Sequence, residues 1–134
     1  MSVNGKLYRL INSVHIHDGP IRCLSVISNT SEGSVEIFSG CQSDAPNVRK
    51  WNLFKKSDFV EEINEIGTPI YHDHWVTALT SLPPDSNRLV YPNGCLITGC
   101  MDTKIRIYDF STGLLVSTLA GHTKGCYILI YVHI

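Results

Sequence analysis

A histidine, a serine and an aspartate in the first half of the sequence are the residue types of a hydrolytic site. His17, Ser39 and Asp44 are the types that a catalytic triad joins in one chain of hydrogen bonds, and Trp51 follows them. The strand-to-helix elbow that exposes a nucleophilic serine has the pattern Gly-x-Ser-x-Gly, and the chain contains no such pattern. A hydrolase therefore stays only a remote alternative.

The same constellation occurs a second time. His72, Thr98 and Asp102 repeat the order of the first set, and Tyr108 stands where the tryptophan would be. Catalytic sites are normally single, so a repeated set indicates architecture. We expect two structural tetrads, no catalytic residue and no enzymatic activity.

Each tetrad has an expected pattern of hydrogen bonds. The aspartate in a tight turn accepts from the histidine, and the indole N–H of Trp51 reaches the hydroxyl of Ser39. Tyr108 lacks the indole donor, so the second network should be the weaker one. We nevertheless expect His72 and Asp102 to pair.

Two pairs of histidines could serve a metal ion. His15 with His17, and His72 with His74, stand two residues apart, a spacing that puts side chains on one face of a strand. No pair of thiols with metal-site spacing accompanies them. We therefore predict no metal and no cofactor.

The cysteines argue against a disulfide framework. Their number is odd and none forms a Cys-x-x-Cys pair, which is typical of a protein from a reducing compartment. We expect them to be buried small hydrophobic residues. They are Cys23, Cys41, Cys95, Cys100 and Cys126.

Composition excludes several classes of partner. Eleven Lys and Arg balance twelve Asp and Glu, so no basic surface favours nucleic acid. The first thirty residues lack the apolar core of a secretory signal, and the longest apolar run is far shorter than the about 20 residues that cross a bilayer. The sequence favours a cytoplasmic or nuclear protein without membrane contact.

An internal repeat organises the chain. The pattern His, three residues, an apolar residue, two residues and Leu occurs three times, beginning at His17, His72 and His122, at separations of 55 and 50 residues. Propeller blades repeat every 40 to 45 residues or so, so each repeat should carry an insertion. The turn-forming segments 29–34 and 83–93 are the expected insertions.

The coarse secondary structure is all strand. The apolar runs are short, rich in Val, Ile and aromatic residues, and separated by Gly, Pro, Asn and Asp. Each repeat is then a four-stranded antiparallel meander. The expected strands are 7–15, 20–27, 35–41, 47–53, 59–66, 75–82, 94–100, 104–110, 114–120 and 126–133.

These motifs resemble the WD repeat, whose signature is a Gly-His pair near the start and a Trp-Asp pair near the end. Gly121-His122 and Tyr108-Asp109 match it best. The resemblance implies an all-β fold, a partial WD-repeat β-propeller of about two four-stranded antiparallel blades plus an N-terminal and a C-terminal strand. The expected division over 1–134 is a strand of the closing blade (1–16), a first repeat (17–71), a second repeat (72–121) and a truncated third repeat (122–134).

A narrower resemblance concerns three segments. Tyr8-Arg9-Leu10, Tyr91 to Gly94, and Leu119 to His122 are similar to the start of the phospholipase A-2-activating protein family. This resemblance implies a propeller that binds ubiquitin or ubiquitinated proteins in protein degradation or sorting. An AAA ATPase would bind only through domains outside these residues. The alternative is a WD-repeat scaffold of an unrelated complex.

The rim of the propeller is the expected surface for a partner. Trp75 follows His74 in the loop before a first strand, where an aromatic side chain can anchor a bound protein. Alternatively, the ring of Trp75 caps the core beneath it. The candidate rim residues are Asp18, Gln42, Asp73, Trp75 and Met101.

The C-terminal segment 127–132 is expected to be an exposed edge. It combines high β-propensity with no charge and no proline, the composition of an aggregation-prone strand. Two blades also share only one interface, so the sequence predicts oligomers unless other repeats or a partner cover the edges.

Overall fold

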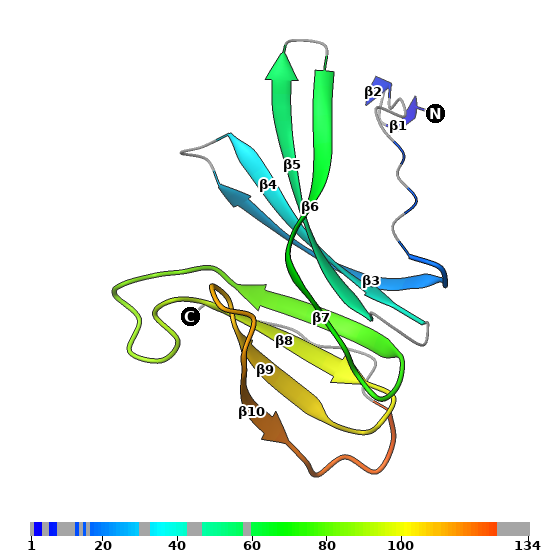
Figure 1. Cartoon of the computed structure of the whole chain (residues 1–134), viewed down its shortest axis with the longest axis vertical. Coiled ribbons are helices and arrows are strands. Elements are labelled where there is room, and N and C mark those ends of the chain that lie inside the picture. Colours follow the sequence, from blue (N-terminus) through cyan, green and yellow to red (C-terminus); the bar gives the residue numbers. More distant parts are fainter. Residues whose placement is uncertain are drawn as a thin grey trace.

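The chain folds into β-sheets, as the sequence predicts. The structure, a computed structural model, describes residues 2–3, 6–7, 13, 15, 17–29, 33–42, 47–57 and 60–125. Over these residues it contains two four-stranded antiparallel sheets and a two-stranded hairpin (Figure 1). No helix in the described ranges could span a membrane.

Each four-stranded sheet is one blade, with its strands adjacent in chain order. The all-β prediction of two antiparallel meanders is thus confirmed, and the predicted ranges agree with the eight strands to within four residues. Blade 1 consists of β3 (Ile21–Asn29), β4 (Ser34–Cys41), β5 (Val48–Ser57) and β6 (Val60–Ile70). Blade 2 consists of β7 (Val76–Leu82), β8 (Cys95–Cys100), β9 (Ile105–Asp109) and β10 (Leu115–Leu119).

The core lies between the blades. Figure 1 shows the two sheets stacked, and β3 and β4 contact β7. Blade 1 contributes Phe38 and Val48, which pack with Val76, Leu79 and Leu96 of blade 2. A sheet must bury its apolar face against another layer, so each blade stabilises the other.

The prediction of a strand over 7–15 is confirmed at Leu7 and wrong at the other two residues of this range that the structure describes. Ser13 and His15 lie outside any strand, and β1 (Ser2–Val3) instead pairs with β2 (Lys6–Leu7). A strand needs a hydrogen-bonding neighbour, and the nearest sequence signal for one is the Asn4-Gly5 dipeptide, which favours a two-residue hairpin. The predicted strand over 126–133 lies outside the described residues.

Gly94 closes the long loop between β7 and β8. Its φ is +81°, and a Cβ at this position would lie 2.5 Å from the Leu82 carbonyl oxygen and 2.9 Å from the Pro84 nitrogen. The Gly94 N–H donates to the Tyr91 carbonyl, and its own carbonyl accepts from the Phe110 N–H. This close approach of two backbone segments requires glycine.

We predict that Gly94→Ala destabilises the fold much more than Gly113→Ala. Gly113 has a similar φ of +72° but nothing within 4 Å of its Cβ position. Alanine at Gly113 should cost only the left-handed backbone, about 1 to 2 kcal/mol. Gly94→Ala adds the collision, about 1 to 3 kcal/mol more. Urea unfolding of both variants checks this, and equal losses would contradict it.

Candidate functional site

The first network centres on a buried serine. Ser39 on β4 has no exposed surface, and the Trp51 indole N–H on β5 donates to its hydroxyl at 3.0 Å. The His17 Nε2 lies 2.7 Å from the same oxygen. The strand register places Ser39 opposite Arg49, so Trp51 is two residues further along β5, on the same face. Asp44, the fourth expected member, lies outside the described residues.

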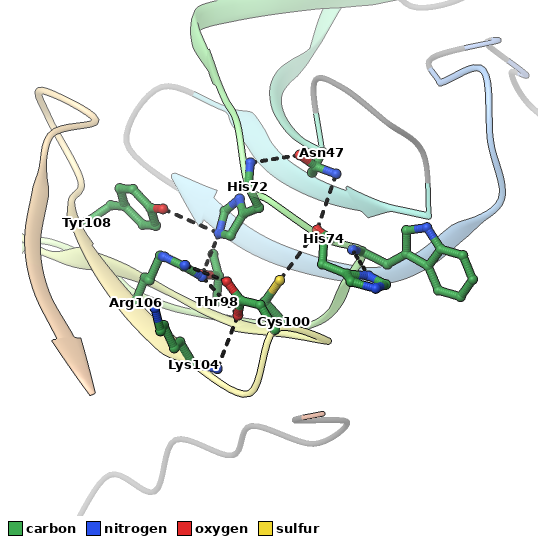
Figure 2. A network of polar contacts seen from close by, with 10 residues as sticks. Asn47, His72, His74, Thr98, Cys100, Lys104, Arg106 and Tyr108 are labelled. Atoms are coloured by element: carbon green, nitrogen blue, oxygen red, sulfur yellow. Dashed lines mark hydrogen bonds and ion pairs between the residues drawn. The ribbon is translucent and has the colours of Figure 1, made fainter. Parts of the chain in front are cut away.

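The second network centres on the histidine instead. His72 Nε2 lies 2.9 Å from the Thr98 hydroxyl and 3.3 Å from the Tyr108 hydroxyl. A phenol carries its hydroxyl at the far end of the ring, whereas an indole carries its N–H on the side. The Tyr108 hydroxyl therefore contacts the His72 imidazole, as Figure 2 shows, whereas the Trp51 indole in the first network contacts the serine hydroxyl.

The predicted pairing of His72 with Asp102 is wrong. Asp102 accepts from both terminal nitrogens of Arg106, at 3.2 and 2.5 Å, and from the Lys104 N–H at 3.1 Å. A permanently charged, planar guanidinium competes better for a carboxylate than a neutral imidazole does. His72 Nδ1 is consequently buried without a hydrogen-bond partner in the described structure.

The two environments move the pKa values of these groups. Burial lowers the pKa of His72 to about 4, and the Arg106 charge adds to the effect, while Asp102 and Asp73 oppose it. Burial by itself would raise the pKa of Asp102, but the bonds from Arg106 and Lys104 outweigh it and hold that pKa at about 2. At neutral pH the imidazole is uncharged and the carboxylate is ionised.

These buried groups are unsuited to nucleophilic chemistry. The Ser39 hydroxyl is fully enclosed between His17 and Trp51. Burial raises the pKa of Cys23 to about 12 and also raises the pKa of Cys95 and Cys100, so these side chains stay as unreactive thiols.

The paired histidines do not converge on a common point. His15 is exposed and lies 3.8 Å from Asp18, whereas His17 is buried against Ser39. His74 Nδ1 accepts the backbone N–H of Trp75 at 2.8 Å. No group of three or more His, Cys, Asp or Glu side chains that could hold a metal ion occurs among the residues described.

Asn47 joins the blades, and sequence reasoning missed it. It lies just before β5 and is 1% exposed. Its Oδ1 accepts the His72 N–H at 2.7 Å, and its Nδ2 donates to the His74 carbonyl at 3.4 Å (Figure 2). The equivalent residue of the second repeat is Lys104, as the matching bonds from Cys41 N to Asn47 O and from Cys100 N to Lys104 O indicate. The repeat therefore gave no sign of this role.

Trp75, which directly follows the segment that Asn47 contacts, lies in the wall of a hollow. This rim hollow has a volume of about 350 Å³ and is lined by Arg22, Gln42, Trp75, Thr77 and Met101. Three of the five predicted rim residues, Gln42, Trp75 and Met101, thus come together. Asp18 and Asp73 are exposed but do not line it, and sequence reasoning missed Arg22 and Thr77.

Trp75 is accessible from solvent. Its side chain is 38% exposed, and its ring lies against the His74 ring at 5.3 Å in an edge-on arrangement. A partly exposed indole at the edge of a hollow is suited to anchor a bound protein.

We predict that Trp51→Phe and His17→Ala are not additive. Both remove a partner of the Ser39 hydroxyl, so the double variant should lose less stability than the sum of the single variants, by about 0.5 to 3 kcal/mol. Trp51→Phe combined with Thr98→Val serves as the control pair, since these residues belong to separate networks. Urea unfolding gives the four free energies, and strict additivity for His17 and Trp51 would refute a shared network.

We predict that His72 makes the fold sensitive to acid. The unfolded imidazole has its usual pKa of about 6.5 and the folded one about 4, so the unfolded state binds more protons between these values. The contribution of His72 to the free energy of unfolding is therefore fully present above about pH 6.5. It is lost as the pH drops toward 4, by up to about 3 kcal/mol. His72→Gln should remove this part of the pH dependence. If the free energies of unfolding of the wild type and His72→Gln change in parallel from pH 7 to 4, the prediction is contradicted.

Comparison with known proteins identifies the repeat. Residues 64–109 match the family of the WD domain, G-beta repeat. The match begins in β6 of blade 1 and ends with β9 of blade 2, so the sequence repeat spans two blades and is offset from them by one strand.

Nuclear distribution proteins are among the relatives of this chain. The chain is 30% identical to nuclear distribution protein PAC1 of Arthroderma otae over 65% of its own length and 17% of the relative. It is 35% identical to PAC1-2 of Uncinocarpus reesii, over 49% of its length and 14% of the relative. It is 28% identical to nuclear distribution protein nudF 1 of Talaromyces marneffei, over 71% and 17%. The chain thus spans less than a fifth of these relatives.

Similarity to solved structures is low. The computationally designed Ika4 protein has a TM-score of 0.44 and 16% identity, over 95% of this chain and 89% of that one. The comparisons do not show the narrower resemblance to phospholipase A-2-activating proteins. Residues 64–109 match the WD domain, G-beta repeat, and the two described sheets have the fold of a partial WD-repeat β-propeller, in a chain that is similar to the nuclear distribution proteins PAC1 and nudF 1.

Proposed function

We propose that the chain is a non-enzymatic scaffold that binds a partner protein in the rim hollow. The observation that carries this proposal is the partly exposed Trp75 in a hollow of about 350 Å³ between two blades. Ligand sites commonly fall in the range of about 300 to 1,000 Å³, and exposed aromatic anchors are typical of interfaces. The WD40 match supports a role in protein interaction.

A second hollow is a weaker candidate. It has a volume of about 70 Å³ and is lined by residues of both blades, including Phe38, Lys50 and Phe110. The Lys50 ammonium lies 4.4 Å from the centre of the Phe110 ring and pairs with Glu36 at 3.3 Å. This side chain already has partners, so the contact serves to join the blades.

We propose that the cellular role is in nuclear distribution. The support is similarity to proteins of that name over 65% and 71% of this chain. A cytoplasmic or nuclear location is part of this proposal. Fold similarity alone does not determine function, so the role depends on the partner bound at the rim.

Ubiquitin binding is a second proposal. Its support is the resemblance of the segments at Tyr8, Tyr91 and Leu119 to phospholipase A-2-activating proteins. It would place the chain in ubiquitin-dependent degradation or sorting. Calorimetric titration of the chain with ubiquitin separates the two proposals, since a nuclear distribution scaffold does not require that affinity.

We predict that Trp75→Ala weakens partner binding without lowering the melting temperature. Removal of an aromatic anchor typically costs about 2 kcal/mol or more of binding energy, which is over tenfold in affinity. In quantitative affinity capture from cell extract, the partner proteins that bind the wild type should be lost with Trp75→Ala and retained with Leu89→Ala. Leu89 is the matched control because it is 99% exposed and does not line the hollow. Unchanged capture by Trp75→Ala would place the binding site elsewhere.

A further inference from the structure

The rim hollow is built from equivalent positions of the two repeats. The Gln42 N–H donates to the Pro20 carbonyl at 2.9 Å, and the Met101 N–H donates to the Trp75 carbonyl at the same distance. These bonds join the end of the second strand to the residue before the first strand in each blade. Two pairs of lining residues are therefore related by the repeat: Arg22 with Thr77, and Gln42 with Met101. The counterpart of Trp75 in the first repeat is Pro20, which does not line the hollow.

The two walls carry different chemistry on this common backbone. Blade 1 contributes a guanidinium and an amide, and blade 2 contributes an indole, a hydroxyl and a thioether. Arg22 is the charged residue in the lining of the described hollow. One wall is therefore cationic and polar, and the other is mainly apolar.

The Arg22 guanidinium is oriented for a ligand. Its Nε donates to the Gln42 Oε1 at 2.7 Å, which fixes the plane of the group. Both terminal nitrogens, which carry the fork of donors that fits a carboxylate, take no part in that bond. In a bound protein, the ionised side chains that can pair with this guanidinium are those of Asp and Glu.

The apolar wall is oriented as well. The Trp75 N–H donates to His74 Nδ1, the indole packs against the His74 ring, and the Trp75 carbonyl accepts from Met101. Asn47 holds the same segment through the His74 carbonyl. These bonds hold the backbone of Trp75, and the contact with the His74 ring restricts the indole, which lowers the entropy cost of binding a ligand against it.

We propose that the rim hollow binds an acidic linear peptide segment of the partner protein. Its Asp or Glu carboxylate pairs with the terminal nitrogens of Arg22, and an adjacent apolar side chain packs between Trp75 and Met101. The inference rests on the proposed function and adds the chemical class of the ligand. A basic segment is disfavoured because it would bring a like charge to Arg22.

The test uses a displayed library of random twelve-residue peptides, selected on the full chain. We expect enriched peptides to share an acidic residue beside an apolar one. A selected peptide and its Glu→Gln or Asp→Asn form are then titrated by fluorescence polarisation against the wild type, Arg22→Gln, Trp75→Ala and Leu89→Ala. The acid-to-amide change in the peptide should lower its affinity about tenfold or more for the wild type. It should lower the affinity little for Arg22→Gln, because this variant has no guanidinium to pair with the carboxylate.

The outcomes separate the two proposals. The inference about the ligand is overturned if the acid-to-amide change lowers peptide affinity by the same factor for the wild type and for Arg22→Gln. It is also overturned if no acidic motif is enriched. If Trp75→Ala still weakens binding in that case, the rim hollow stands as the partner site. If the peptides bind Trp75→Ala as well as Leu89→Ala, the proposed site itself fails.

Discussion

The structure depends on the burial of blade 1 against blade 2. A four-stranded sheet cannot bury an apolar face alone, and Phe38 and Val48 find their cover in Val76, Leu79 and Leu96 of the next blade. The short segment from Tyr71 to Trp75 connects the blades, and Asn47 fixes it by polar contacts. The interface and this bridge together place every residue of the rim hollow.

Within each blade, a buried histidine, a hydroxyl and an aromatic side chain hold the strands in register. The two networks use the same positions but differ in connectivity. In blade 1 the hydroxyl of Ser39 is the shared atom, whereas in blade 2 it is Nε2 of His72. The replacement of Trp by Tyr108 causes this change. It shows how one substitution at a repeated position redirects a network without changing the fold.

The sequence predicted the fold well because the repeat and the alternation of apolar residues are local signals. The eight blade strands and the buried positions of His17, Ser39 and Thr98 follow from them. Two features did not follow. Arg106 takes Asp102 from His72, a competition that charge decides and spacing does not reveal. Arg22 reaches the hollow beside Trp75, a residue 53 positions away in the chain, and only the packing of two blades brings them together.

The two-blade origin of the rim hollow has a thermodynamic consequence. Because Arg22 and Gln42 belong to one blade and Trp75 and Met101 to the other, a ligand that touches both walls binds only when the blades are docked. By mass action, such a ligand stabilises the docked state by an amount that grows with its concentration relative to its dissociation constant. Occupancy of the hollow and the rigidity of the blade pair are therefore coupled quantities. A bound partner stabilises the docked arrangement of the two blades, and a more stable blade interface in turn raises the affinity for the partner.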